Sequence, residues 1–122
     1  MYKVIKIGWV VIAMAFLGNI FFNENSDQEA DIRSMIKNGA LIIDTRSSDE
    51  FSGGHVEDAV NIPYDLIPAA IEQHTTDKSE PIIVYCHAGV RSGIAKQSLE
   101  QLGFTHVING GSYQRMQDLL AQ

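Results

Sequence analysis

The chain has 122 residues, of which 45% are hydrophobic and 20% charged, a composition typical of one globular domain. The formal net charge is −6, and without Lys3 and Lys6 seven basic residues stand against fifteen acidic ones, so no nucleic-acid partner is expected. Cys86 is the single cysteine, which excludes an intrachain disulfide and a two-thiol redox mechanism within the chain.

The first 23 residues differ in composition from the rest. Lys3 and Lys6 precede an apolar run over residues 7–22, the pattern of an export signal. The run is close to the ~17 residues that can span a bilayer. Small residues suited to a cleavage site occur only at Ala13 and Ala15, which favours an uncleaved anchor over a cleaved signal. We therefore expect residues 1–23 to be a signal or membrane anchor and residues 24–122 to be an exported, periplasmic domain. Its only membrane contact would be a tether to the inner membrane through residues 7–22.

The domain begins with a predicted helix. Ser26 and Glu29 have the spacing of a capping box, and Gly39 is the expected stop. The helix has apolar residues at the spacing of one buried face, namely Ile32, Met35 and Ile36.

Strands and helices then alternate along the chain. Short, apolar and β-branched runs predict four strands, at residues 40–43, 60–62, 82–85 and 106–108. Helical spacing and caps predict helices at residues 49–52, 66–74 and 92–102 and from Ser112 onward, with a turn at Gly110 and Gly111. The alternation predicts a single α/β domain with a mainly parallel central sheet flanked by helices.

Cys86 directly follows the predicted strand 82–85. In parallel sheets of this kind ligands bind beyond the carboxyl ends of the strands, where loops enter helices. The amides of a tight loop and the positive end of the next helix form an anion-binding nest and lower a thiol pKa below the ~8.5 of a free cysteine. Gly89 permits the tight loop, and Arg91 offers a planar fork for oxyanions. Cys86 is thus the candidate catalytic nucleophile, and the substrate-binding candidates are His87, Ala88, Gly89, Val90, Arg91 and Ser92.

From about Gln28 to the C-terminus the sequence resembles the rhodanese family, and most closely the small exported single-domain rhodaneses of the bacterial phage-shock type. The matching motifs are Cys86 with Arg91 after four residues, Asp44-Thr45-Arg46, Glu50-Phe51, Gly54-His55-Val56, Ala59-Val60-Asn61-Ile62-Pro63 and Gly110-Gly111. The resemblance implies a rhodanese-like fold and a thiosulfate sulfurtransferase. Such an enzyme moves sulfane sulfur from a small anionic donor to a thiophilic acceptor, cyanide or a thiol, through a persulfide on Cys86.

The active loop departs from the family pattern at two positions, and two further residues are expected to have a structural role. His87 and Val90 stand where many relatives carry further basic or polar residues, so thiosulfate turnover is expected to be modest. Asp44 and Arg46 are expected to support the sheet edge, with Arg46 paired to Asp44 or Glu50.

Two other functions compete with sulfur transfer. A Cys-based phosphatase or arsenate reductase would resemble proteins with five residues between Cys and Arg, whereas this chain has four. A rhodanese-like redox or binding module is the other alternative, although such modules often lose the cysteine.

His55 is expected to be a structural, hydrogen-bonding histidine. No cofactor is expected, and no paired spacing of ligands indicates a metal site. The oligomeric state is left open.

Overall fold

The computed structural model describes residues 28–122. The predicted signal or anchor, the boundary at residue 23 and the Ser26 cap lie outside the described residues. Residues 32–122 form one compact unit. Within the described part of the chain, no helix combines the length and the apolar character needed to cross a membrane.

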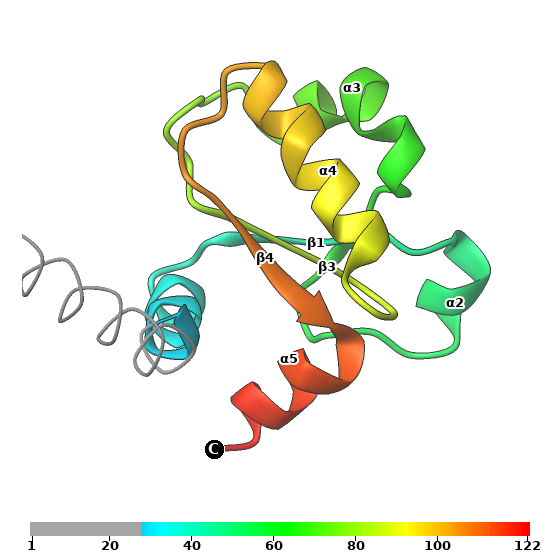
Figure 1. Cartoon of the computed structure of the whole chain (residues 1–122), viewed down its shortest axis with the longest axis vertical. Helices are drawn as coiled ribbons and strands as arrows, with labels where there is room; N and C mark the ends of the chain where they lie inside the picture. The colour runs from blue at the N-terminus through cyan, green and yellow to red at the C-terminus, as the bar shows by residue number, and fades with distance from the viewer. Residues whose placement is uncertain (1–27) are drawn as a thin grey trace, which may run out of the picture. The chain divides into compact units, whose positions relative to one another are not determined.

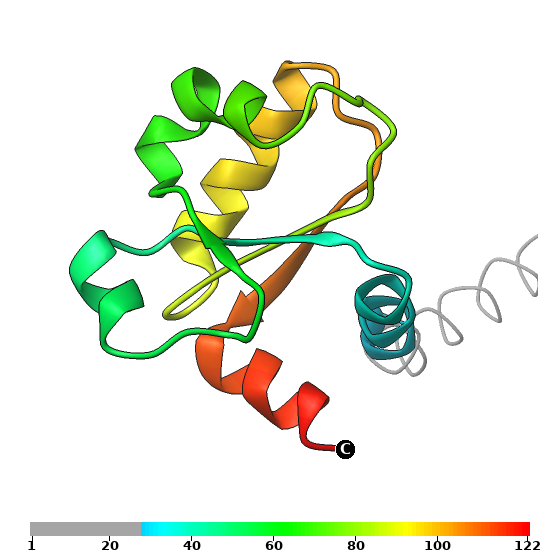
Figure 2. The same ribbon diagram turned by 180° about the vertical axis from the view of Figure 1, so that it is seen from behind.

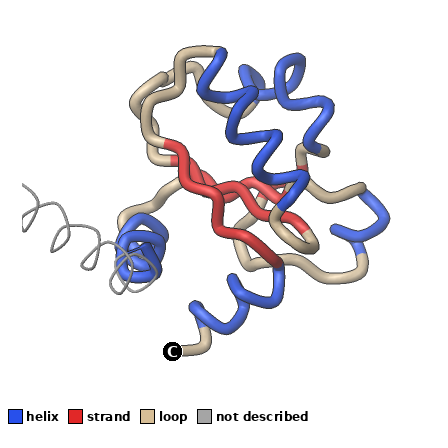
Figure 3. Tube along the Cα trace, viewed as in Figure 1, coloured by secondary structure: helices blue, strands red, loops and turns tan. Residues whose placement is uncertain are grey.

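Four strands form one sheet in the order β2-β1-β3-β4, and every neighbouring pair is parallel. Their bounds are Leu41–Asp44 for β1, Val60–Asn61 for β2, Ile82–Cys86 for β3 and Val107–Ser112 for β4. Because β1 and β3 are neighbours and run parallel, their carboxyl ends, Asp44 and Cys86, come to the same edge of the sheet (Figures 1 and 3). The predicted α/β class with a mainly parallel sheet is confirmed.

The two faces of the sheet carry separate apolar cores, because alternate strand residues point to opposite sides. Ile43, Ile82 and Val84 pack in one core, whereas Ile42, Ile83 and Tyr85 pack in the other. Helices α3 (Ile67–Ala70) and α4 (Val90–Gln101) lie over the first face, and α5 (Tyr113–Leu120) lies over the second, as the two opposite views show (Figures 1 and 2). The helix over residues 28–37 contributes Ile32 and Met35 to the second core, as its apolar spacing predicts.

The predicted helix over residues 66–74 is wrong in form. The segment consists of a 3-10 turn η1 (Tyr64–Leu66), the four-residue α3, and a second 3-10 turn η2 (Ile71–Gln73). No side chain caps α3, and Pro68 in its first turn cannot donate a backbone hydrogen bond. The expected cap, Asp65, lies instead within η1. The continuous helix is thus replaced by the short helix α3 between two 3-10 turns.

Two other boundaries differ in a way that shapes the site. The helix expected from Ser92 begins at Val90, because Gly89 adopts a left-handed conformation, with φ 93°, and starts the helix without a side-chain cap. The turn expected at Gly110 and Gly111 is wrong, because both residues lie inside β4. The register with β3 shifts between Val84 and Tyr85, which makes Gly110 the extra residue of a bulge. A Cβ at Gly110 would lie 2.6 Å from the Met116 sulfur, so any larger residue there requires the Met116 side chain to move.

The short helix α2 (Ser48–Ser52) forms as predicted, beginning one residue earlier than expected. Ser47 and Glu50 make a reciprocal capping box, which holds the Glu50 side chain at the start of the helix.

Candidate active site

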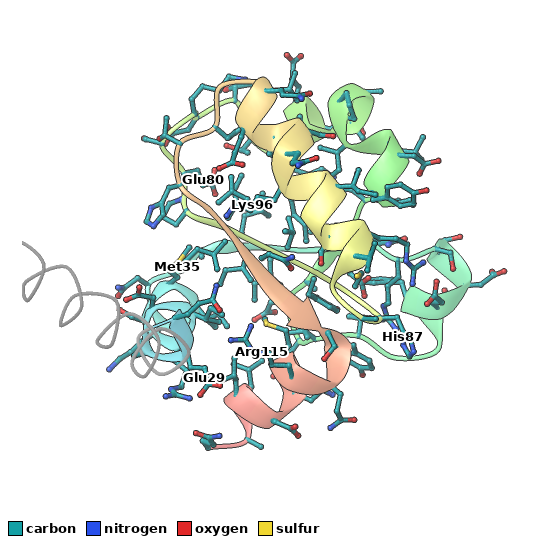
Figure 4. The ribbon with its side chains drawn as sticks, in the orientation of Figure 1. Glu29, Met35, Glu80, His87, Lys96 and Arg115 are labelled. Carbon is teal, nitrogen blue, oxygen red and sulfur yellow. The ribbon has the colours of Figure 1, made fainter. Side chains whose placement is uncertain are left out.

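Cys86 ends β3, and residues 87–89 form the loop that leads into α4. The thiol side chain is only 1% exposed, whereas His87, Ala88 and Val90 are exposed around it. Figure 4 shows the labelled His87 on this loop, on the side where α2 lies. The structure thus gathers Cys86 and the predicted binding residues into one loop and the first turn of α4, with the sulfur at its base.

The Cys86 sulfur is surrounded by hydrogen-bond donors. The Gly89 amide donates to Sγ over 2.9 Å, and the Ser92 hydroxyl lies 3.4 Å away. Burial raises the pKa of the Cys86 thiol, but the Ser92 hydroxyl and the amides of Ser92, Ala88 and Gly89 lower this pKa by more. The net shift is downward, as the loop sequence predicts, so the Cys86 thiol ionises more readily than an unperturbed cysteine.

Asn109 on β4 is a site residue that sequence reasoning missed. Its amide nitrogen donates to the Gly89 carbonyl over 3.1 Å, and its side-chain oxygen accepts from the Ser92 hydroxyl over 2.7 Å and from the Gly111 amide over 2.9 Å. Asn109 therefore fixes both ends of the turn that holds the sulfur. The only signal in the sequence was a polar residue inside an apolar strand and next to two glycines.

The Ser92 hydroxyl has one proton to share among three acceptors. It lies close to Asn109 Oδ1, to the Gly89 carbonyl oxygen and to Cys86 Sγ. A hydroxyl can donate only once, and a charged acceptor makes the stronger bond. Ionisation of Cys86 therefore draws the Ser92 proton toward the sulfur, while Asn109 keeps its bond from the Gly111 amide.

Arg91 lies beside the loop, but its guanidinium is already paired. Its two terminal nitrogens donate to the two carboxylate oxygens of Glu50 over 2.7 and 3.0 Å. Hydrogen bonding to Arg91 holds the pKa of Glu50 down at about 2, and the Ser47 bonds lower this pKa further, against a smaller opposing effect of burial. The sequence allowed Asp44 or Glu50 as the partner of Arg46. The structure pairs Arg46 with Asp44, whereas Glu50 anchors α2 to the active loop through Arg91.

Asp44 and Arg46 form a buried cluster next to the site. Arg46 donates to both oxygens of Asp44, and Tyr85 donates its hydroxyl proton to Asp44 over 2.7 Å. Arg46 also donates to the Gly54 carbonyl over 2.6 Å. Tyr85 in turn accepts from the Val56 amide, so the cluster joins β1, β3 and the loop that precedes β2.

His55 packs and hydrogen-bonds against Phe51 of α2. Its ring stacks on Phe51 with the centroids 3.7 Å apart, and its Nδ1 lies 3.0 Å from the Phe51 carbonyl oxygen. Among residues 28–122, no group of three or more His, Cys, Asp or Glu side chains could hold a metal ion.

The sheet, the loop and α4 together define an α/β protein with a loop of hydrogen-bond donors built around one cysteine. The Rhodanese-like domain family matches residues 28–116. The chain belongs to the rhodanese family.

Individual relatives agree with this membership. The chain is 41% identical over 69 residues to the Thiosulfate sulfurtransferase PspE of Escherichia coli, and the match covers 57% of this chain and 66% of that protein. A solved structure of a rhodanese with anions from E. coli has a TM-score of 0.61 and 36% identity, and the match covers 63% of this chain and 91% of that one. The human single-domain sulfurtransferase TSTD1 has a TM-score of 0.65 at 24% identity, over 73% and 91% of the two chains, and supports the fold alone.

Proposed function

We propose that the protein is a sulfurtransferase that carries sulfane sulfur as a persulfide on Cys86. The observation that carries the proposal is the position of the thiol, at the end of β3, with the Gly89 amide 2.9 Å from Sγ and the start of α4 beside it. These donors stabilise a negative sulfur, and they suit both the thiolate and the persulfide.

The reaction proceeds in two balanced steps. The Cys86 thiolate attacks the outer sulfur of a donor such as thiosulfate; the new S–S bond forms while the S–S bond of the donor breaks, and sulfite leaves with the electron pair. The terminal sulfur of the persulfide is then attacked by cyanide or a thiolate, which regenerates the Cys86 thiolate. This is covalent catalysis, in which the loop amides stabilise the charge that moves along the sulfur atoms.

The relatives support this chemistry without assigning it. PspE is a thiosulfate sulfurtransferase, and the chain spans 66% of its length. The four residues between Cys86 and Arg91 also favour sulfur transfer over phosphate chemistry, because a compact loop wraps a single sulfur atom more readily than a tetrahedral phosphoryl group.

Intact-protein mass spectrometry after thiosulfate treatment tests the proposal. We expect one added sulfur atom, which cyanide removes as thiocyanate. The Cys86→Ser variant should gain no sulfur and form no thiocyanate, whereas Ser98→Ala, at the far end of α4, should behave as the wild type. Thiocyanate formation by Cys86→Ser, or hydrolysis of aryl phosphates that depends on Cys86 and equals sulfur transfer in rate, would reject the persulfide mechanism.

We further propose that residues 24–122 are exported, with residues 7–22 as the signal or membrane anchor. Lys3 and Lys6 before the apolar run support this orientation. Alkaline phosphatase fused after Gln122 should be active in bacteria, because that reporter works only outside the cytoplasm. An inactive fusion would contradict export, and a shortened N-terminus would contradict only the uncleaved anchor.

A further inference from the structure

The permanent positive charge of the active loop is already neutralised. Arg91 is the only Lys or Arg in residues 86–92, and both of its terminal nitrogens bind the Glu50 carboxylate. Glu50 is itself held in place by the capping box of α2, so it is positioned independently of any substrate. A donor that enters the loop therefore meets backbone amides and an ion pair of zero net charge.

The outer edge of the loop is apolar. Val90 follows Gly89, whose amide bonds the Cys86 sulfur, and its side chain is 72% exposed. Ile94 lies one helical turn further along the same side of α4 and is 44% exposed. Val90 and Ile94 thus give the start of α4 an exposed aliphatic surface, which begins at the residue that follows the loop of Cys86.

The overall charge acts against a dianionic donor. Seven basic residues stand against fifteen acidic ones when Lys3 and Lys6 are left out. A field of this sign lowers the local concentration of anions, and the penalty grows with the charge of the anion. Thiosulfate, with two negative charges and no carbon, gains nothing from Val90 or Ile94 to offset this penalty.

We propose that the preferred sulfur donor of this protein is an organic sulfane-sulfur compound with one negative charge and an apolar group that lies on Val90 and Ile94. Val90 is then a specificity-determining residue. This inference rests on the proposed sulfurtransferase function and names its substrate class.

A thiosulfonate, R–SO2–S⁻, represents this class and reacts in a balanced step. The Cys86 thiolate attacks the terminal sulfur; the bond between that sulfur and the sulfonyl sulfur breaks, and a sulfinate, R–SO2⁻, leaves with the electron pair. The product on the enzyme is the same persulfide that thiosulfate would give. Because the reacting group is constant within the class, R reports the apolar contact.

Persulfide formation is measured with three donors: benzenethiosulfonate, methanethiosulfonate and thiosulfate. In the wild type we expect kcat/KM to fall in that order. Intrinsic reactivity differs among donors, so the decisive quantity is how the ratios change between variants of Val90, a residue whose exposure makes folding insensitive to the change.

Three variants separate the effects of charge and apolar contact. Val90→Ser should reduce the ratio of benzenethiosulfonate to methanethiosulfonate by about tenfold, the low end for a lost apolar contact. Val90→Arg should reduce that ratio similarly and raise kcat/KM for thiosulfate about tenfold through the added charge. Leu102→Arg places the same charge at the opposite end of α4. It should change neither the ratio of benzenethiosulfonate to methanethiosulfonate nor kcat/KM for thiosulfate.

The outcomes distinguish this inference from the proposed function. If all three donors form the persulfide but neither Val90 variant changes the ratios, the substrate class is wrong and the sulfurtransferase proposal stands. If Leu102→Arg changes the ratios as much as Val90→Arg, overall charge and not the loop edge governs selection, and the inference is overturned. If no donor forms a persulfide in a protein whose Cys86 is still alkylated, the proposed function itself fails.

Discussion

Two arginine–carboxylate pairs lie near the carboxyl edge of the sheet, and their surroundings differ sharply. In the Asp44–Arg46 pair the side chains are 0% and 6% exposed, whereas in the Glu50–Arg91 pair they are 36% and 31% exposed. The contact distance between nitrogen and oxygen is 2.7 Å in both. The same chemical pair thus serves two purposes: the buried pair, through the Tyr85 hydrogen bond to Asp44, helps to link β1 to β3, and the half-exposed pair sets the charge of the active loop.

The buried pair and the active loop lie on different sides of β3 because of two consecutive residues of that strand. Tyr85 and Cys86 point to opposite sides of the strand, so Tyr85 reaches the Asp44 cluster while the Cys86 thiol faces the loop. Burial makes loss of an Asp44 partner costly, because a buried charge without its partner is strongly unfavourable. Because the Glu50–Arg91 pair is exposed to solvent, it contributes little to the free energy of unfolding. A substitution in this pair therefore alters mainly the charge beside the active loop.

Asp44→Ala should produce the largest effect in this comparison. It leaves the Arg46 guanidinium and the Tyr85 hydroxyl without their buried acceptor, and we expect the free energy of unfolding to fall by about 3–5 kcal/mol. Urea denaturation measures the loss. Asp44→Asn, which keeps an acceptor of the same shape, should lose less and provides a folded variant. A loss equal to that of Glu50→Gln would contradict the contrast between the two pairs.

Ser92→Ala should have an intermediate effect, on the loop side of the comparison. Removing the hydroxyl costs one hydrogen bond, about 1 kcal/mol of stability, and removes the largest contribution that lowers the pKa of Cys86. Iodoacetamide alkylation as a function of pH should therefore have a midpoint below the ordinary ~8.5 of a cysteine in the wild type, and a higher midpoint in the variant. Ser98→Ala is the matched control on the same helix. Unchanged midpoints would show that the amides alone stabilise the thiolate.

Glu50→Gln should change stability less than either variant above. Glutamine can maintain the capping box with Ser47, so the substitution removes mainly the charge of the pair with Arg91. We expect a loss under about 1 kcal/mol in the free energy of unfolding, which shrinks as salt is added. Glu57→Gln makes the same change at another exposed residue. A loss that does not depend on salt would indicate a pair that acts as a buried one.

The smallest expected effect is the pH dependence of the difference in unfolding free energy between the wild type and Glu50→Gln. The folded-state pKa of Glu50 is about 2, below its ordinary value of 4.5, because of the hydrogen bonds from Arg91. The contribution of the pair is therefore fully present above pH 4.5 and is lost as the pH falls toward 2. The difference in unfolding free energy between wild type and Glu50→Gln should be constant from pH 8 to about 5 and should vanish near pH 2. A difference that persists at pH 2 would contradict the assignment.

The sequence was informative wherever function depends on residues that are neighbours in the chain. Asp44 and Cys86 were placed at strand ends because each directly follows an apolar, β-branched run. The partner of Arg91 was missed because Glu50 is 41 residues away and the contact depends on how α2 meets the loop. Gly110 and Gly111 were assigned to a turn because glycine pairs usually mark one, and only the register with β3 shows that they form a bulge.

The near-complete burial of the Cys86 sulfur limits what this atom can reach. A disulfide to another protein requires the two Cβ atoms to approach within about 4.5 Å, and a thiol that is 1% exposed at the base of a loop does not allow this. In the proposed cycle, the added sulfur extends about 2 Å beyond Sγ, toward the mouth of the loop. If this proposed cycle holds, the unloaded protein is shielded from crosslinking with large thiol proteins, and the added sulfur is the atom of the site that a large acceptor would touch.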